Sequence, residues 1–264
     1  MQNNLAVSPA RTSNEESSSV KRGQPTSWWH EARALYRKDI KAELRTKVAI
    51  SSVGLFTFSS LMLIALATAN MKDVKAYNAI SNGSGSLAWD YASRMGMLWV
   101  LLCFAAFAGL SHSFVHEEEA GTTTALRLSM SPEAVYVGKL LFNLTLVLSV
   151  TLVVTPVYML ITDMPFHEPV KFLTLMFGGC LGLSAAATIV AALAAKAHGT
   201  GALYGAIGLP MLVVFLTLLM NAATSLYKDG LPLSSSIRDL GGLLSYAILL
   251  ITLSAMTFRF VWED

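Results

Sequence analysis

Charge is scarce in this sequence, and it is unevenly distributed. Only 14% of the 264 residues are charged, 54% are hydrophobic, and the charged residues are excluded from six long apolar blocks. Soluble domains carry roughly 25% charged residues, spread along amphipathic elements. The composition therefore excludes an ordinary soluble domain and predicts an integral membrane protein.

Other signals of a function class are also missing. The two cysteines, Cys103 and Cys180, lie inside apolar blocks, so they predict no disulfide framework and say nothing about the redox compartment. A net charge of +2 gives no argument for nucleic acid as a partner. The sequence has no G-x-x-x-x-G-K-[ST] loop, so it carries no nucleotide site of that kind.

Residues 1–26 lack an apolar run. They are rich in Ser, Asn, Thr and Pro with interspersed charge, a composition that is typical of disorder. A secretory signal peptide would need an apolar stretch after its basic residues. We therefore expect a disordered cytoplasmic tail here and no signal peptide.

An amphipathic helix is predicted over residues 27–47. Ser27 suits the N-cap, and Glu31 places negative charge in the first turn. An apolar stripe recurs at three- and four-residue steps and consists of Trp29, Ala32, Tyr36, Ile40 and Leu44. The remaining faces are basic: Arg33, Arg37, Lys38, Lys41 and Arg45. Such a helix lies at the membrane surface with its cations toward lipid phosphate, and a protein partner on the same helix stays an open alternative.

Six apolar blocks follow, and each is long enough for a membrane-spanning helix. They cover residues 48–69, 95–115, 140–162, 172–195, 199–221 and 240–258. At 1.5 Å per residue each extends roughly 28–36 Å, which is enough to cross a hydrocarbon core of about 30 Å. We therefore expect an all-α protein with a six-helix transmembrane domain over 48–264.

Basic residues indicate the orientation. Six of them cluster just before the first block, at Arg33, Arg37, Lys38, Lys41, Arg45 and Lys47, whereas the loops expected on the opposite side share six in total, at Lys72, Lys75, Arg94, Lys171, Lys228 and Arg238. The positive-inside rule then places both termini in the cytoplasm. We expect a multi-pass protein of a bacterial cytoplasmic (inner) membrane.

Small and polar residues mark the second half. Gly178, Gly179 and Gly182 form a small face in the fourth block, which favours packing within the chain. A homodimer seam is the open alternative. The polar stretch 222–242 is expected to form a short separate helix on the external side.

A polar loop over residues 114–139 separates the second and third blocks. Three glutamates, Glu117 to Glu119, end the second block because they cannot lie in lipid without a large cost. Ser131, Pro132 and Glu133 then supply an N-cap, a first-turn proline and a first-turn acid. The loop therefore has the form of a surface on which another protein could dock.

His112 and His116 lie one helical turn apart beside this loop. The spacing would suit one metal ion or a haem edge. No third ligand is near in sequence, so we predict no metal site, and an interfacial pair explains the residues better.

Two segments resemble the cytochrome c maturation protein B (CcmB) family. They are KDIKAELRTKVAI from Lys38 and GMLWVLLCFAAFAGLSHSFVHEEEAGTTTALRLSMSPEAVYVGKLLFN from Gly96. The family's ELR-T-K run is present at Glu43 to Lys47. Its F-x-x-E-x-x-x-G, Pro and Y-x-G-K pattern is present at Phe114, Glu117, Gly121, Pro132, Tyr136, Gly138 and Lys139. The sequence departs from it at Val48, Thr123 and Thr124.

The resemblance implies a type 2 ABC exporter permease with a coupling loop after the second span. Its expected role is haem export, or ATP-coupled release of a haem-loaded chaperone, in cytochrome c maturation. Its expected partners are an ABC ATPase (CcmA-like), a haem-handling membrane protein (CcmC-like) and a small single-span subunit (CcmD-like). Haem enters only as cargo of the complex, and no resident cofactor or catalytic residue is expected. The residues expected to couple to the ATPase are Glu43, Arg45, Glu117, Gly121 and Lys139.

Two other functions would each explain part of the sequence. A rhomboid-type protease would use Ser184, but His198 lies 14 residues beyond it, roughly 21 Å along a helix, so its chemistry is disfavoured. An ABC exporter permease for another apolar cargo, such as a drug, lipid or glycan, stays the main alternative.

Overall fold

The structure, a computed structural model, describes residues 28–70, 91, 93–108, 129–164, 166, 168–196, 201–227 and 233–263. Every regular element in these ranges is a helix, which confirms the predicted all-α class for the described part of the chain. In chain order the helices are α1 (Trp28–Thr46), α2 (Val48–Asn70), the Ser93–Ala108 helix, α6 (Pro132–Thr162), α7 (Pro169–Lys196), α8 (Gly201–Tyr227) and α9 (Leu233–Glu263).

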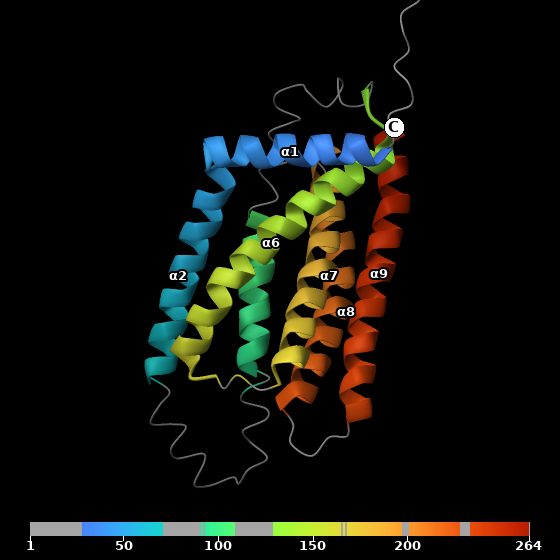
Figure 1. The fold of residues 1–264 in the computed structure, drawn as a ribbon. Coiled ribbons are helices and arrows are strands. Elements are labelled where there is room, and N and C mark those ends of the chain that lie inside the picture. The colour runs from blue at the N-terminus through green and yellow to red at the C-terminus, as the bar shows by residue number, and fades with distance from the viewer. Residues whose placement is uncertain are drawn as a thin grey trace, which may run out of the picture.

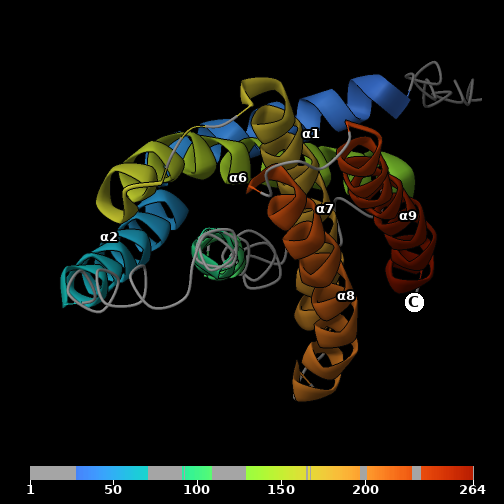
Figure 2. The same ribbon diagram turned by 90° about the horizontal axis from the view of Figure 1, so that it is seen from below.

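The helices form an upright bundle with one helix across its end. Figure 1 shows α1 running over one end of the bundle, at a steep angle to α2 and to the α7–α9 group. The view from below in Figure 2 shows α7, α8 and α9 grouped together, with α2 standing apart on the other side of the Ser93–Ala108 helix. The helix α6 runs along α1 at its start and reaches α2 at its end, so it connects the two sides (Figures 1 and 2).

Four of the described helices contain apolar stretches long enough to cross a membrane: Ile50–Thr68, Pro132–Thr162, Pro169–Val190 and Ile237–Arg259. Two shorter apolar helices, Ser93–Ala108 and Pro210–Leu226, coincide with the second and fifth predicted spans. The chain is therefore a multi-pass membrane protein by length and composition. That the chain crosses the membrane six times, and that its helices have the type 2 arrangement, stay predictions.

The core is centred on α7. In its apolar stretch 72% of the residues are buried, against 11% in that of α2. A methyl group added to Gly179 would stand 2.0 Å from the Trp99 ring, and one added to Gly182 would stand 2.2 Å from the Phe215 ring. The small face predicted in the fourth block therefore receives large side chains of the same chain, from the Ser93–Ala108 helix and from α8.

The Ser93–Ala108 helix is tied to the end of α6 by polar contacts. The buried Arg94 guanidinium donates to the Thr162 carbonyl, and the Tyr158 hydroxyl donates to the Arg94 carbonyl at 2.6 Å. Because a buried arginine needs partners for its charge and donors, this joint holds the two helix ends together.

The expectation of a separate helix within 222–242 is wrong for the residues that the structure describes. The helix α8 continues to Tyr227, and α9 begins at Leu233, so the polar stretch lengthens both neighbouring helices. The physical reason is a cross-helix contact in which the Ser225 hydroxyl donates to the Asp239 carboxylate. This contact gives polar residues at both helix ends a partner within the chain.

Candidate coupling site

The start of α6 is held by the first turn of α1. Ser131 is the N-cap of α6 and Pro132 follows it, as the sequence pattern predicts, but the serine hydroxyl makes no capping bond within its own helix. The Ser131 N–H and its hydroxyl instead donate to Glu31 Oε2, each at 3.2 Å. The Glu31 carboxylate therefore supplies the negative charge that a helix N-terminus favours, and it does so from α1.

The two helices approach closely at Gly138. A methyl group added there would lie 3.0 Å from Leu35 Cδ2 and 3.1 Å from the Ala32 carbonyl oxygen. Ala32 and Leu35 are 0% and 1% exposed, so they form the buried face of α1. A larger residue at position 138 would push the α1 backbone away from α6.

An ion pair lies further along the same interface. Lys139 Nζ stands 3.0 Å from Asp39 Oδ2, and the side chains are 1% and 7% exposed. The pair joins α6 to the buried face of α1, one turn beyond Leu35. Because a buried charge without its partner is costly, this contact fixes the rotation of α1 about its own axis.

Glu43 forms the joint between α1 and α2. Lys47 stands between the two helices with a φ of 56°, in the left-handed region, and lets the chain turn sharply. The Glu43 carboxylate accepts a hydrogen bond of 2.9 Å from the N–H of Ile50 in the first turn of α2. A carboxylate in this position satisfies an otherwise unpaired N–H and interacts favourably with the helix dipole.

The acidic and the basic side chains of α1 therefore lie on different faces of the helix. Its three acids each contact another helix: Glu31 and Asp39 contact α6, and Glu43 contacts α2. Its basic residues are all exposed: Arg33, Arg37, Lys38, Lys41 and Arg45. The acids hold the helix in place, and the outer surface of α1 is left strongly cationic.

The predicted apolar stripe does not coincide with the buried face. Ala32 is buried and Tyr36 half-buried, but Trp29 and Leu44 are 54% and 61% exposed. The buried face instead follows Ala32, Leu35 and Asp39. An acid in register with two apolar residues is the sequence signal for an inward ion pair, and the predicted stripe does not include it.

The structure describes three of the five residues expected to couple to the ATPase. Glu43 and Arg45 lie at the α2 end of α1, with Glu43 in the joint and Arg45 exposed. Lys139 lies inside, paired with Asp39. Glu117 and Gly121 lie outside the described residues, as do most of the loop 114–139 and the pair of His112 and His116.

Within the described ranges, no three His, Cys, Asp or Glu side chains lie close enough together to hold a metal ion. The joint between α1, α6 and α2 can transmit a mechanical force. A force applied to the cationic surface of α1 would reach α6 and α2 through three polar contacts and one close helix crossing.

The sequence matches a family described as CcmB protein over residues 30–259, from the first turn of α1 into the last turns of α9. No curated protein gives a match. The family match covers most of the chain and agrees with its apolar helices. The chain therefore belongs to the CcmB family, which implies a non-catalytic permease subunit that works with an ATPase partner in a haem-exporting ABC system for cytochrome c biogenesis.

Proposed function

We propose that this subunit passes the ATP-driven motion of a CcmA-like ATPase into its membrane helices. The motion would serve release of a haem-loaded periplasmic chaperone during cytochrome c maturation. In this proposal the subunit spans an inner membrane six times with both termini in the cytoplasm. Its further partners are a CcmC-like haem-handling protein and a small CcmD-like subunit.

The observation that supports this proposal is the fixed position of α1. The helix lies across one end of the bundle and is held at Glu31, Asp39 and Glu43, near its start, middle and end. Such a helix cannot tilt without moving the start of α6 or α2. A partner that pushes on α1 would therefore move two helices that diverge into the membrane.

The five coupling residues take different parts in this mechanism. Arg45 is exposed, and Glu117 and Gly121 belong to the predicted coupling loop, so these three are proposed to contact the ATPase. Glu43 and Lys139 have partners inside the chain, and we assign them the role of transmitting the motion. Arg45, Glu117 and Gly121 are thus proposed contact residues, and Glu43 and Lys139 are proposed positioning residues.

Reversing the charge of the loop tests the proposal. We expect Glu117→Lys to abolish maturation of c-type cytochromes, measured by haem staining, while the subunit is inserted at its normal level. Glu168→Lys is the matched control, since Glu168 is 61% exposed and its ion pair with Lys171 spans 3.7 Å at the surface. Surface pairs of this kind contribute about 0–1 kcal/mol.

Purification of each tagged variant in mild detergent separates two reasons for a defect. A coupling defect leaves the ATPase and the haem-handling protein associated with the subunit, whereas a docking defect loses the ATPase. Normal cytochrome maturation by the Glu117→Lys variant would contradict the assignment of the loop.

A further inference from the structure

A pocket lies along the first half of α1, on the part of the helix away from its joint with α2. It has a volume of about 680 Å³ and is lined by Trp29, His30, Arg33, Tyr36, Arg37 and Leu141. Small-molecule sites have volumes of about 300–1,000 Å³. The pocket is therefore large enough for the polar end of an amphiphilic molecule.

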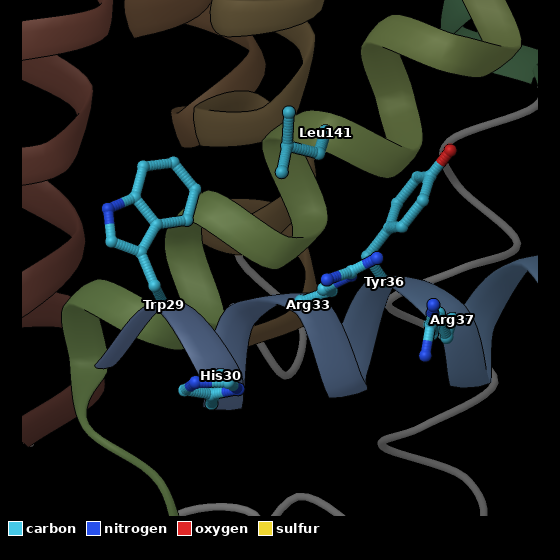
Figure 3. A pocket seen from close by; sticks show the side chains of 6 residues that line it. All are labelled: Trp29, His30, Arg33, Tyr36, Arg37 and Leu141. Atoms are coloured by element: carbon cyan, nitrogen blue, oxygen red, sulfur yellow. The ribbon is translucent and has the colours of Figure 1, made fainter. Parts of the chain in front are cut away.

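The walls of the pocket divide into an apolar and a cationic part. Figure 3 shows the Trp29 and Tyr36 rings standing on the side of α1 that faces Leu141 of α6, with Arg33 between them along the helix. His30 lies on the side of α1 away from Leu141 (Figure 3). Aromatic rings at a membrane surface accept apolar groups on one side and water on the other. The arrangement suits a ligand with an anionic head and an apolar body.

Both rings of the aromatic wall have a contact within the chain. The Thr145 hydroxyl donates to the Leu141 carbonyl at 2.8 Å, so the Tyr36 hydroxyl, 3.2 Å from Thr145 Oγ1, is the donor in that contact. The Trp29 ring stacks on Trp28 with 4.6 Å between ring centroids. Fixed rings lose little conformational entropy on binding.

The cationic part has no counter-charge in the described part of the chain. Arg33 and Arg37 are one helical turn apart, both are exposed, and neither forms an ion pair with a described residue. Like charges at this spacing destabilise a helix. The acids of α1 cannot relieve the repulsion, because Glu31, Asp39 and Glu43 contact other helices. An anion between the two guanidinium groups would relieve it and receive two-pronged hydrogen bonds.

We propose that this pocket is a specific binding site for the phosphate headgroup of an anionic glycerophospholipid. Its place, where a helix lying across the bundle meets the start of an apolar span, is the depth at which lipid phosphates lie. Binding there differs from general adsorption of a basic helix, because it uses the two arginines of the pocket and not the net charge of α1. The bound lipid would join α1 to α6 and so set how firmly the helix is held.

Lipid selectivity of two charge-matched variants tests the site. The full chain is purified in a neutral detergent, and native mass spectrometry measures binding of phosphatidylglycerol and of phosphatidylcholine with the same acyl chains. We expect the unmodified protein to prefer phosphatidylglycerol at least about tenfold. The Arg33→Gln/Arg37→Gln variant should lose about thirtyfold in affinity for it, since each basic residue near an anionic surface contributes roughly a factor of five.

The control variant, Lys41→Gln/Arg45→Gln, removes the same charge at the same four-residue spacing from exposed positions of the same helix outside the pocket, and it should keep its affinity within about threefold. A third variant, Arg33→Lys/Arg37→Lys, keeps the charge and loses the two-pronged geometry, so its affinity should fall between the other two. Thermal unfolding of each purified variant verifies that it is folded, which is expected because both arginines are exposed.

Four results would overturn the proposal. Equal losses in the two glutamine variants would show diffuse attraction, and equal binding of both lipids would show that the headgroup is not recognised. Inorganic phosphate that competes as well as the lipid would assign the site to a free anion. Haemin that displaces phosphatidylglycerol at equal concentration would assign it to a different anionic amphiphile.

Discussion

Asp39 and Lys139 form an ion pair that is almost entirely withdrawn from the surface, at 7% and 1% exposure. Two charges moved out of water lose their hydration, and only a close partner compensates for that loss. The pair therefore acts as a constraint more than as a source of stability. It allows α1 one rotation on α6, the rotation in which the basic residues face outward.

We expect Lys139→Met to destabilise the protein by about 3 kcal/mol, because the buried Asp39 charge would lose Lys139 and keep the exposed Lys38, whose Nζ lies 3.7 Å from its Oδ1. The double variant Asp39→Leu/Lys139→Met should recover most of this loss, since replacing a whole buried pair by apolar residues is often neutral. Thermal unfolding in detergent, arranged as a double-mutant cycle, measures both effects. A double variant no more stable than Lys139→Met alone would show that the two charges are not coupled.

The helices differ in how much of their length the rest of the chain covers. The helix α7 is enclosed by its neighbours, and its glycines receive the rings of Trp99 and Phe215. In α2 most side chains are exposed, and no atom lies within 4 Å of the position that a side chain at Gly54 would take. The same substitution should therefore have opposite consequences in these two helices.

We expect Gly179→Ala to destabilise the protein by about 1–3 kcal/mol, because the new methyl group would overlap the Trp99 ring and force a shift in a packed core. Gly54→Ala should be neutral, or stabilising by up to about 1 kcal/mol, because alanine has the higher helix propensity. Unfolding temperatures of the two variants, measured side by side in the same detergent, give the comparison. Similar losses at both sites would contradict the assignment of α7 as the core helix.

On the scale of the whole molecule, α6 connects two groups of helices. It contacts α1 and α2 on one side and α7 and α9 on the other, so movement of α1 reaches both groups through one helix. The starts of α2 and α6 both contact α1, so the chain returns to the α1 end of the bundle before α6 begins. Six crossings satisfy this condition, whereas four crossings, by the long apolar helices alone, would place the start of α6 on the side opposite to α1. A coupling loop can face the same partner as α1 only if the Ser93–Ala108 helix belongs to a crossing segment.

Cysteine labelling distinguishes the two topologies. With six crossings, Thr123→Cys reacts with a membrane-impermeant thiol reagent only after the membrane is opened, and Phe166→Cys reacts in intact cells or spheroplasts. If only the four long apolar helices crossed, the two positions would exchange sides, and that result would contradict the contacts of α1 with the starts of both α2 and α6. We expect the first result. The buried Cys103 and Cys180, replaced by serine or left unreactive, provide the background control.

The amino-acid sequence by itself determined the class of the protein and the positions of most of its helices. Apolar blocks, a serine–proline start at Ser131 and basic residues before the first span are local patterns, and the matching helices begin or end within a few residues of most predicted positions. Only the tertiary structure decided which face of α1 is buried. The partners of Glu31 and Asp39 lie 100 residues away along the chain, at Ser131 and Lys139. Helical periodicity does not predict such contacts, because it describes a helix alone and not the surface on which that helix packs.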